Sequence, residues 1–82
     1  NEAVKKHEAG DIAGAIPLYV QALQMAPKNG AGWKNLATAY QQSDDFAKAR
    51  DAYQQALTVD SKNQSDCWYF IALLDENFNK GT

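Results

Sequence analysis

The chain has 82 residues, a formal net charge of −2 and a single cysteine, Cys67. The slightly acidic balance argues against a surface built for nucleic acid or for anionic membranes, and one cysteine excludes an internal disulfide. No apolar run approaches the roughly 20 residues of a membrane-spanning helix. We find no signal peptide, which leaves the compartment open with the cytoplasm favoured. Because the chain begins at Asn1 without methionine, we expect an excised fragment of a longer protein.

Two helices are predicted in the first third of the chain. Residues 1 to 9 are expected to be the end of a poorly anchored helix, and Gly10 and Asp11 form a turn after it. The second helix is predicted over residues 12 to 26, where Pro17 should cause a small kink and Pro27 ends the helix. Its apolar residues recur at helical spacing, which predicts a buried stripe of Ile12, Ala15, Ile16, Tyr19, Ala22 and Leu23, with Met25 or Ala26 near the end.

The middle of the chain shows the clearest helical pattern. Trp33, Leu36, Ala37 and Tyr40 recur at i, i+3, i+4 and i+7, which is one face of a helix. A second helix follows with an equivalent face, made by Phe46, Ala49, Tyr53, Ala56 and Leu57. Between them, Ser43-Asp44-Asp45 predicts a turn in which an aspartate oxygen caps the second helix.

A fifth helix is predicted near the C-terminus. Its apolar stripe consists of Cys67, Phe70, Ile71, Leu74 and Phe78. Trp68 and Tyr69, together with Leu73, should lie off this stripe, which is unusual for a helix at the end of a stack. We expect them either to be covered by a further helix of a longer protein or to contact another chain.

The chain also repeats itself with a period of 34 residues. A shift by this amount aligns Tyr19 with Tyr53 and Leu23 with Leu57, and it brings Cys67 into the position of Trp33. We therefore predict one domain over residues 1–82. It divides into a partial first repeat over 1–29, a second repeat over 30–63, and the first helix of a third repeat or a terminal helix over 64–82.

The second repeat resembles the tetratricopeptide repeat family. The family signature W-x-x-L-(G/A)-x-x-Y, then A-x-x-x-(F/Y)-x-x-A and usually P, is matched by Trp33, Leu36, Ala37, Tyr40, Ala49, Tyr53 and Ala56, with Ser61 in place of the proline. The resemblance implies an all-α fold of antiparallel helical hairpins, stacked as a right-handed α-solenoid of about five helices. In the family, the first helices of the hairpins line a concave groove that binds a peptide or helix of a partner protein.

This resemblance gives a set of candidate groove residues. They are the side chains expected to face away from the core on the first helices of the repeats: Asn1, Lys34, Asn35, Thr38, Gln41, Gln42, Trp68 and Tyr69. Asn1 and Asn35 occupy the same repeat position and could form two rungs of an asparagine ladder that bonds a peptide backbone, which Tyr69 interrupts. A solvated helix face is the alternative reading for the polar members.

A different groove chemistry of the family does not fit. The carboxylate clamp that holds the C-terminus of heat-shock chaperones needs two asparagines and several basic residues. Asn35 matches one of them, but Val4, Ser65 and Tyr69 stand at other positions of the clamp. We therefore do not expect the chain to bind a C-terminal carboxylate in this way.

No pattern of catalytic, cofactor-binding or metal-binding residues emerges. His7 has no partner at ligand spacing and is expected on the surface, and Cys67 is expected to be a small buried hydrophobe. We predict a protein-interaction module with a protein or peptide partner, and not an enzyme. Three alternatives stay open: a structural spacer in a longer array, a fragment that self-associates through Trp68 and Tyr69, and a domain appended to an enzyme.

Overall fold

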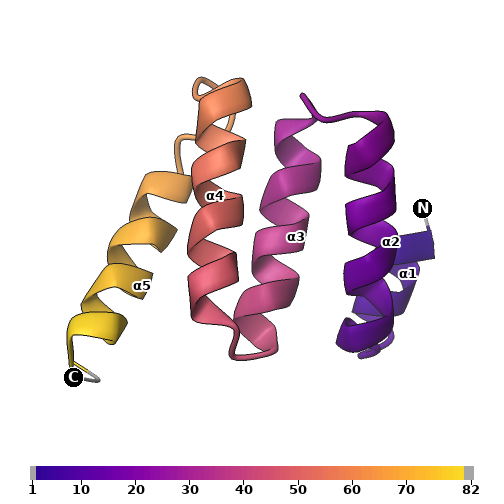
Figure 1. The fold of residues 1–82 in the computed structure, drawn as a ribbon, viewed down its shortest axis with the longest axis horizontal. Coiled ribbons are helices and arrows are strands. Elements are labelled where there is room, and N and C mark those ends of the chain that lie inside the picture. Colours follow the sequence, from indigo (N-terminus) through magenta and orange to yellow (C-terminus); the bar gives the residue numbers. More distant parts are fainter. Residues whose placement is uncertain (1, 81–82) are drawn as a thin grey trace.

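The computed structural model describes the backbone of residues 2–80 and the side chains of residues 2–74. The chain folds into five helices in a row, with no strand in this range (Figure 1). They are α1 (Glu2–Glu8), α2 (Ile12–Met25), α3 (Gly30–Gln42), α4 (Phe46–Asp60) and α5 (Cys67–Lys80). The expected all-α fold of antiparallel helical hairpins is confirmed. The right-handed drift of the stack and the exact division into repeats stay predictions.

Each helix packs mainly on the helix before and after it in the chain. Figure 1 shows α2, α3, α4 and α5 side by side in sequence order, with the short α1 behind the lower half of α2. Contacts made mostly between neighbours in sequence are characteristic of a solenoid, in which each unit is stabilised by the next one. As a result, both broad sides of the row are lined by helices and are available as surfaces.

The turns after α1 and α3 have the same geometry 34 residues apart. Gly10 and Asp44 both have a left-handed backbone, with φ of +91° and +62°. The amide that follows each of them donates back into its helix, from Asp11 to the Lys6 carbonyl at 2.8 Å and from Asp45 to the Tyr40 carbonyl at 2.9 Å. This is the hydrogen bond that ends many helices at a left-handed residue. The repeat period seen in the sequence therefore extends to the backbone.

The starts of the long helices are capped unequally. Asp11 accepts a hydrogen bond from the Gly14 amide at 3.0 Å, and Asn29 accepts one from the Gly32 amide at 3.2 Å. The prediction that an aspartate side chain caps the helix after Ser43-Asp44-Asp45 is wrong. Asp45 occupies the cap position of α4 without a side-chain hydrogen bond to the backbone, and its carboxylate lies 3.8 Å from the ammonium of Lys48 instead.

Alanines hold the centre of the stack. Ala15, Ala37, Ala39, Ala49 and Ala56 are all fully buried, because a methyl group lets neighbouring helices approach closely. The larger side chains of Tyr53, Cys67 and Leu74 fill the space that remains, and all three are buried as predicted. Trp33 and Phe70 are only half-buried and pack against the edge of this core.

The predicted core of α2 is wrong at its C-terminal end. Ala22, Met25 and Ala26 are exposed, although Ala56, the repeat equivalent of Ala22, is fully buried. The reason is the short partner helix, since α1 has seven residues and covers only part of α2. Helix α2 runs through Pro17 without a break, while the small kink expected from this proline stays a prediction.

We predict that enlarging a buried alanine of α4 destabilises the fold, because the close approach of the helices leaves no room. Ala49→Leu should lower the free energy of unfolding by about 1–3 kcal/mol. Ala47→Leu is the matched control, since Ala47 is exposed two residues earlier on the same helix. Urea unfolding followed by circular dichroism measures both, and equal stabilities of the two variants would contradict tight packing around Ala49.

Candidate functional site

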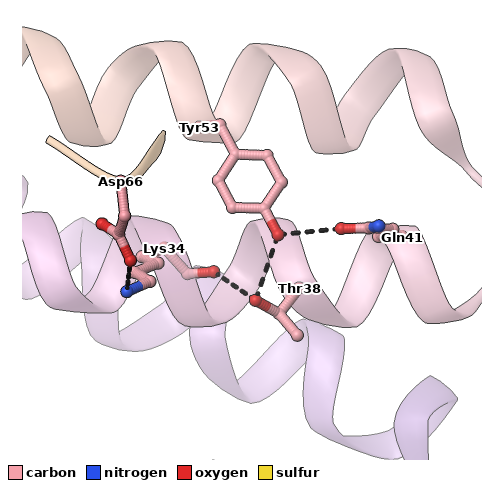
Figure 2. A network of polar contacts seen from close by, with 5 residues as sticks. All are labelled: Lys34, Thr38, Gln41, Tyr53 and Asp66. Atoms are coloured by element: carbon pink, nitrogen blue, oxygen red, sulfur yellow. Dashed lines mark hydrogen bonds and ion pairs between the residues drawn. The ribbon is translucent and has the colours of Figure 1, made fainter. Parts of the chain in front are cut away.

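One side of α3 carries a network of polar contacts that reaches α4 and the loop before α5. Lys34, Thr38 and Gln41 follow one another at helical spacing, and Figure 2 shows the Tyr53 hydroxyl pointing toward Thr38 and Gln41 from α4. Tyr53 donates a hydrogen bond to Oε1 of Gln41 at 2.9 Å. Thr38 donates to the Lys34 carbonyl at 3.0 Å, and its hydroxyl lies 3.3 Å from that of Tyr53.

Lys34 forms an ion pair with Asp66, which lies in the loop between α4 and α5 (Figure 2). The hydrogen bond to Asp66 raises the pKa of the Lys34 ammonium, although partial burial works in the opposite direction. The lysine therefore stays protonated at neutral pH, and its charge is already balanced. Lys34 links α3 to the start of α5 and does not present an unpaired cation to a ligand.

Tyr53 connects three helices. Its ring stacks on Phe70 of α5, with ring centres 5.0 Å apart and planes inclined by 14°. Its hydroxyl donates a hydrogen bond to Gln41 of α3. Burial is the main cause that raises the pKa of the Tyr53 phenol. The neutral hydroxyl is therefore the form that the fold stabilises, which suits its role as a donor to Gln41.

His7 is not the isolated surface residue that the sequence indicated. It is half-buried, its Nδ1 lies 2.9 Å from the Tyr19 hydroxyl, and its Nε2 pairs with Oε1 of Gln42 on α3. His7 and Tyr19 stand 34 residues before Gln41 and Tyr53, so the same tyrosine contact occurs in both hairpins. The repeat alignment could have found this contact, because it places His7 in the position of Gln41.

The remaining candidate residues are exposed or lie outside the described range. The Asn35 side chain is exposed and makes no hydrogen bond to another described residue. Asn1 lies outside the described residues, so the asparagine ladder stays a prediction. Trp68 and Tyr69 are 60% and 63% exposed, and they occupy the repeat positions of Lys34 and Asn35. The expectation that they lie off the buried stripe of α5 is confirmed.

The candidate residues thus fall into two groups with different roles. Side chains or loops outside α3 contact all four of Lys34, Thr38, Gln41 and Gln42. Asn35, Trp68 and Tyr69 are exposed to solvent. A surface of this kind offers hydrogen bonds from an amide and large aromatic contact areas, which suits binding.

The described residues contain no metal-binding cluster, and their cysteine is not in a reactive state. No group of three His, Cys, Asp or Glu side chains among them could hold a metal ion. Cys67 is buried, and burial together with Asp66 raises the pKa of its thiol, which disfavours the reactive thiolate.

Within residues 2–80, none of the helices has both the length and the apolar character needed to cross a bilayer.

Comparison with known proteins supports the repeat assignment. The family model described as tetratricopeptide repeat matches residues 6–74. A TPR repeat-containing protein of Pseudomonas aeruginosa is 33% identical over 73 residues, which covers 83% of this chain and 70% of the relative. The uncharacterized protein ycf37 of Pyropia yezoensis is 36% identical over 58 residues, and the general transcriptional corepressor ssn6 of Schizosaccharomyces pombe is 34% identical over 65 residues. The matches cover 71% and 78% of this chain but only 33% and 6% of those two relatives.

We predict that removing the Tyr53 hydroxyl destabilises the fold, because Gln41 loses its donor and Thr38 loses a neighbour. Tyr53→Phe should lower the free energy of unfolding by about 1 kcal/mol. Tyr69→Phe removes the same atom from an exposed ring and should change the stability by less than about 0.5 kcal/mol. Urea unfolding measures the stability of both variants. A Tyr53→Phe variant as stable as the wild type would show that the Tyr53 hydroxyl contributes nothing to the stability of the fold.

The side chains whose pKa is raised in the folded state predict a loss of stability at alkaline pH. The folded state raises the pKa of Cys67, of Tyr19 and Tyr53, and of Lys34 above their ordinary values of 9.0, 10.0 and 10.5. A raised pKa stabilises the fold fully below the ordinary value, and that contribution is lost as the pH rises through the folded value. The free energy of unfolding should therefore fall from about pH 9 upward.

Urea unfolding at a series of pH values between 7 and 11 measures this loss. Tyr53→Phe should show a smaller decrease than the wild type, because it has one group fewer that ionises on unfolding. If Tyr53→Phe and the wild type lose stability in parallel, burial of the Tyr53 phenol is not a cause of the pH dependence.

Proposed function

Because the chain belongs to the tetratricopeptide repeat family, we propose that it is a binding module for a peptide or helix of a partner protein. The contact surface is the side of α3 and α5 that carries Asn35, Trp68 and Tyr69. The observation that carries this proposal is the exposure of two large aromatic rings, Trp68 and Tyr69, at the repeat positions of Lys34 and Asn35. Repeats of this family are generally non-catalytic, and we propose no enzymatic activity for the chain.

The chemistry of this surface favours recognition of a peptide backbone with one apolar or aromatic anchor. The Asn35 amide can donate and accept at once, which matches the alternating groups of a peptide backbone. Exposed tryptophan and tyrosine are the residues that most often contribute large parts of a binding energy. Lys34 is already paired with Asp66, so it is not a free cation for a C-terminal carboxylate.

A selection experiment tests the proposal. Peptides are selected from a random displayed library on the wild-type chain, and the dissociation constant of each is measured for the wild type and for Asn35→Ala combined with Trp68→Ala. We expect at least about a tenfold weakening, since loss of an aromatic anchor and its neighbour costs roughly 1.4 kcal/mol or more. Lys34 is left unchanged, because its removal would leave Asp66 without its partner.

Gln54→Ala serves as the control, since Gln54 is an exposed residue of α4. It should bind every selected peptide as the wild type does. Selected peptides that bind the double variant with unchanged affinity would contradict the proposed surface.

The exposed aromatic pair also supports a second candidate, which is self-association. Two copies that share Trp68 and Tyr69 at a contact would remove these rings from water. Sedimentation velocity from micromolar to millimolar concentration measures this, and a shift to faster species in the wild type that is absent in Trp68→Ser is the expected result. A wild-type chain that stays monomeric over the whole range removes this candidate.

A further inference from the structure

A groove of about 390 Å³ lies between α2 and α4, with α3 as its floor. This volume falls in the range of ordinary ligand-binding pockets. The groove faces another side of α3 than the polar network. At about 100° per residue, its floor residues Trp33, Leu36 and Tyr40 lie roughly 130° around the helix from Lys34, Thr38 and Gln41.

The groove exists because α3 separates α2 from α4 along the row of helices (Figure 1). Val20 and Leu23 of α2 form one wall of the groove. Ala52 of α4 lines the opposite wall, where its small side chain leaves space. The floor is held in place, because the indole nitrogen of Trp33 donates a hydrogen bond to the Pro27 carbonyl at 2.8 Å. The groove is therefore apolar inside and already formed without a ligand.

Charged side chains of α4 stand at the rim, and they are not equivalent. The ammonium of Lys48 lies 5.8 Å from the centre of the Tyr40 ring and 3.8 Å from the Asp45 carboxylate. The carboxylate of Asp51 also lines the groove, and it makes no ion pair or hydrogen bond to another described residue. The unpaired charge at the groove is therefore negative, and a partner with a positive charge at this point is complementary to it.

We propose that this groove is a second interaction site, which binds a basic amphipathic helix of a partner protein. An apolar side chain of that helix enters between α2 and α4, and a lysine or arginine one turn away pairs with Asp51. A helix fits this site because an apolar face laid into a groove between helices is a common mode of recognition. An added strand does not, because the described part of the chain offers no sheet edge.

The two tryptophans of the chain make the site testable, because one lies on each candidate surface. Trp33 lies on the floor of the groove, and Trp68 lies exposed on α5. Each indole N–H gives a separate signal in a nitrogen–proton correlation spectrum, and Trp68→Phe assigns them. The probes are two synthetic helices of about 18 residues, long enough to be partly helical in water. Both carry the same leucine and alanine face, and their polar faces carry lysine in one and glutamate in the other.

We expect the lysine helix to shift the Trp33 signal and not the Trp68 signal, and the glutamate helix to shift neither at the same concentration. Asp51→Asn should weaken binding of the lysine helix about three- to tenfold, which is the weakening expected when one charge pair at a rim is lost. Glu2→Gln is the charge-matched control and should bind within twofold of the wild type. Glu2 is exposed at the start of α1 and does not line the groove.

A variant of the groove wall tests the apolar part separately. Val20→Thr replaces one methyl group of a half-buried side chain with a hydroxyl of similar size, so it should also weaken binding of the lysine helix. Circular dichroism confirms that the variant is folded. Three outcomes overturn the proposal: equal binding of the two helices, equal effects of Asp51→Asn and Glu2→Gln, and a shift of the Trp68 signal alone. The last outcome would place the helix on the α5 surface, so it separates this site from the one proposed above.

Discussion

The close approach of the helices at fully buried alanines is the constraint on which the rest of the structure depends. Ala37 on α3 and Ala49 and Ala56 on α4 leave so little space that one large side chain, Tyr53, can reach from α4 to both neighbouring helices. Its ring meets Phe70 and its hydroxyl meets Gln41. The position of α5, and with it the exposure of Trp68 and Tyr69, follows from this contact and from the pairing of Lys34 with Asp66.

Helix order and most of the core could be predicted from the sequence, because the 34-residue period and the helical spacing of apolar residues are local signals. Tyr53, Cys67 and Leu74 are buried as that spacing indicates. The prediction failed at Ala22 because a repeat pattern gives no information on how much of its partner helix is present. Ala22 has the sequence environment of Ala56, but α1 is too short to cover it.

The polar side chains were harder to predict, for a physical reason. A helical wheel shows which way Lys34, Gln41 and Gln42 point, but it does not show that Asp66, Tyr53 and His7 come from other elements to meet them. These partners are far away in the sequence, between 12 and 35 residues. The groove between α2 and α4 was missed for the same reason, since it needs walls from two helices that do not follow each other in the chain.

Each of the two candidate surfaces contains one tryptophan, Trp33 in the groove and Trp68 on α5. These two tryptophans differ by one position in the 34-residue repeat. Trp33 stands at the position that Cys67 occupies on α5, and there a small buried thiol replaces the indole. The tryptophan of α5 comes one residue later, at Trp68, in the position of Lys34. One residue turns a side chain by about 100° around a helix, which carries the indole from the side of the groove to the side of the polar network. A tryptophan ring therefore forms the floor of an apolar groove on α3. On α5 a tryptophan ring is exposed, next to Tyr69, which occupies the repeat position of Asn35.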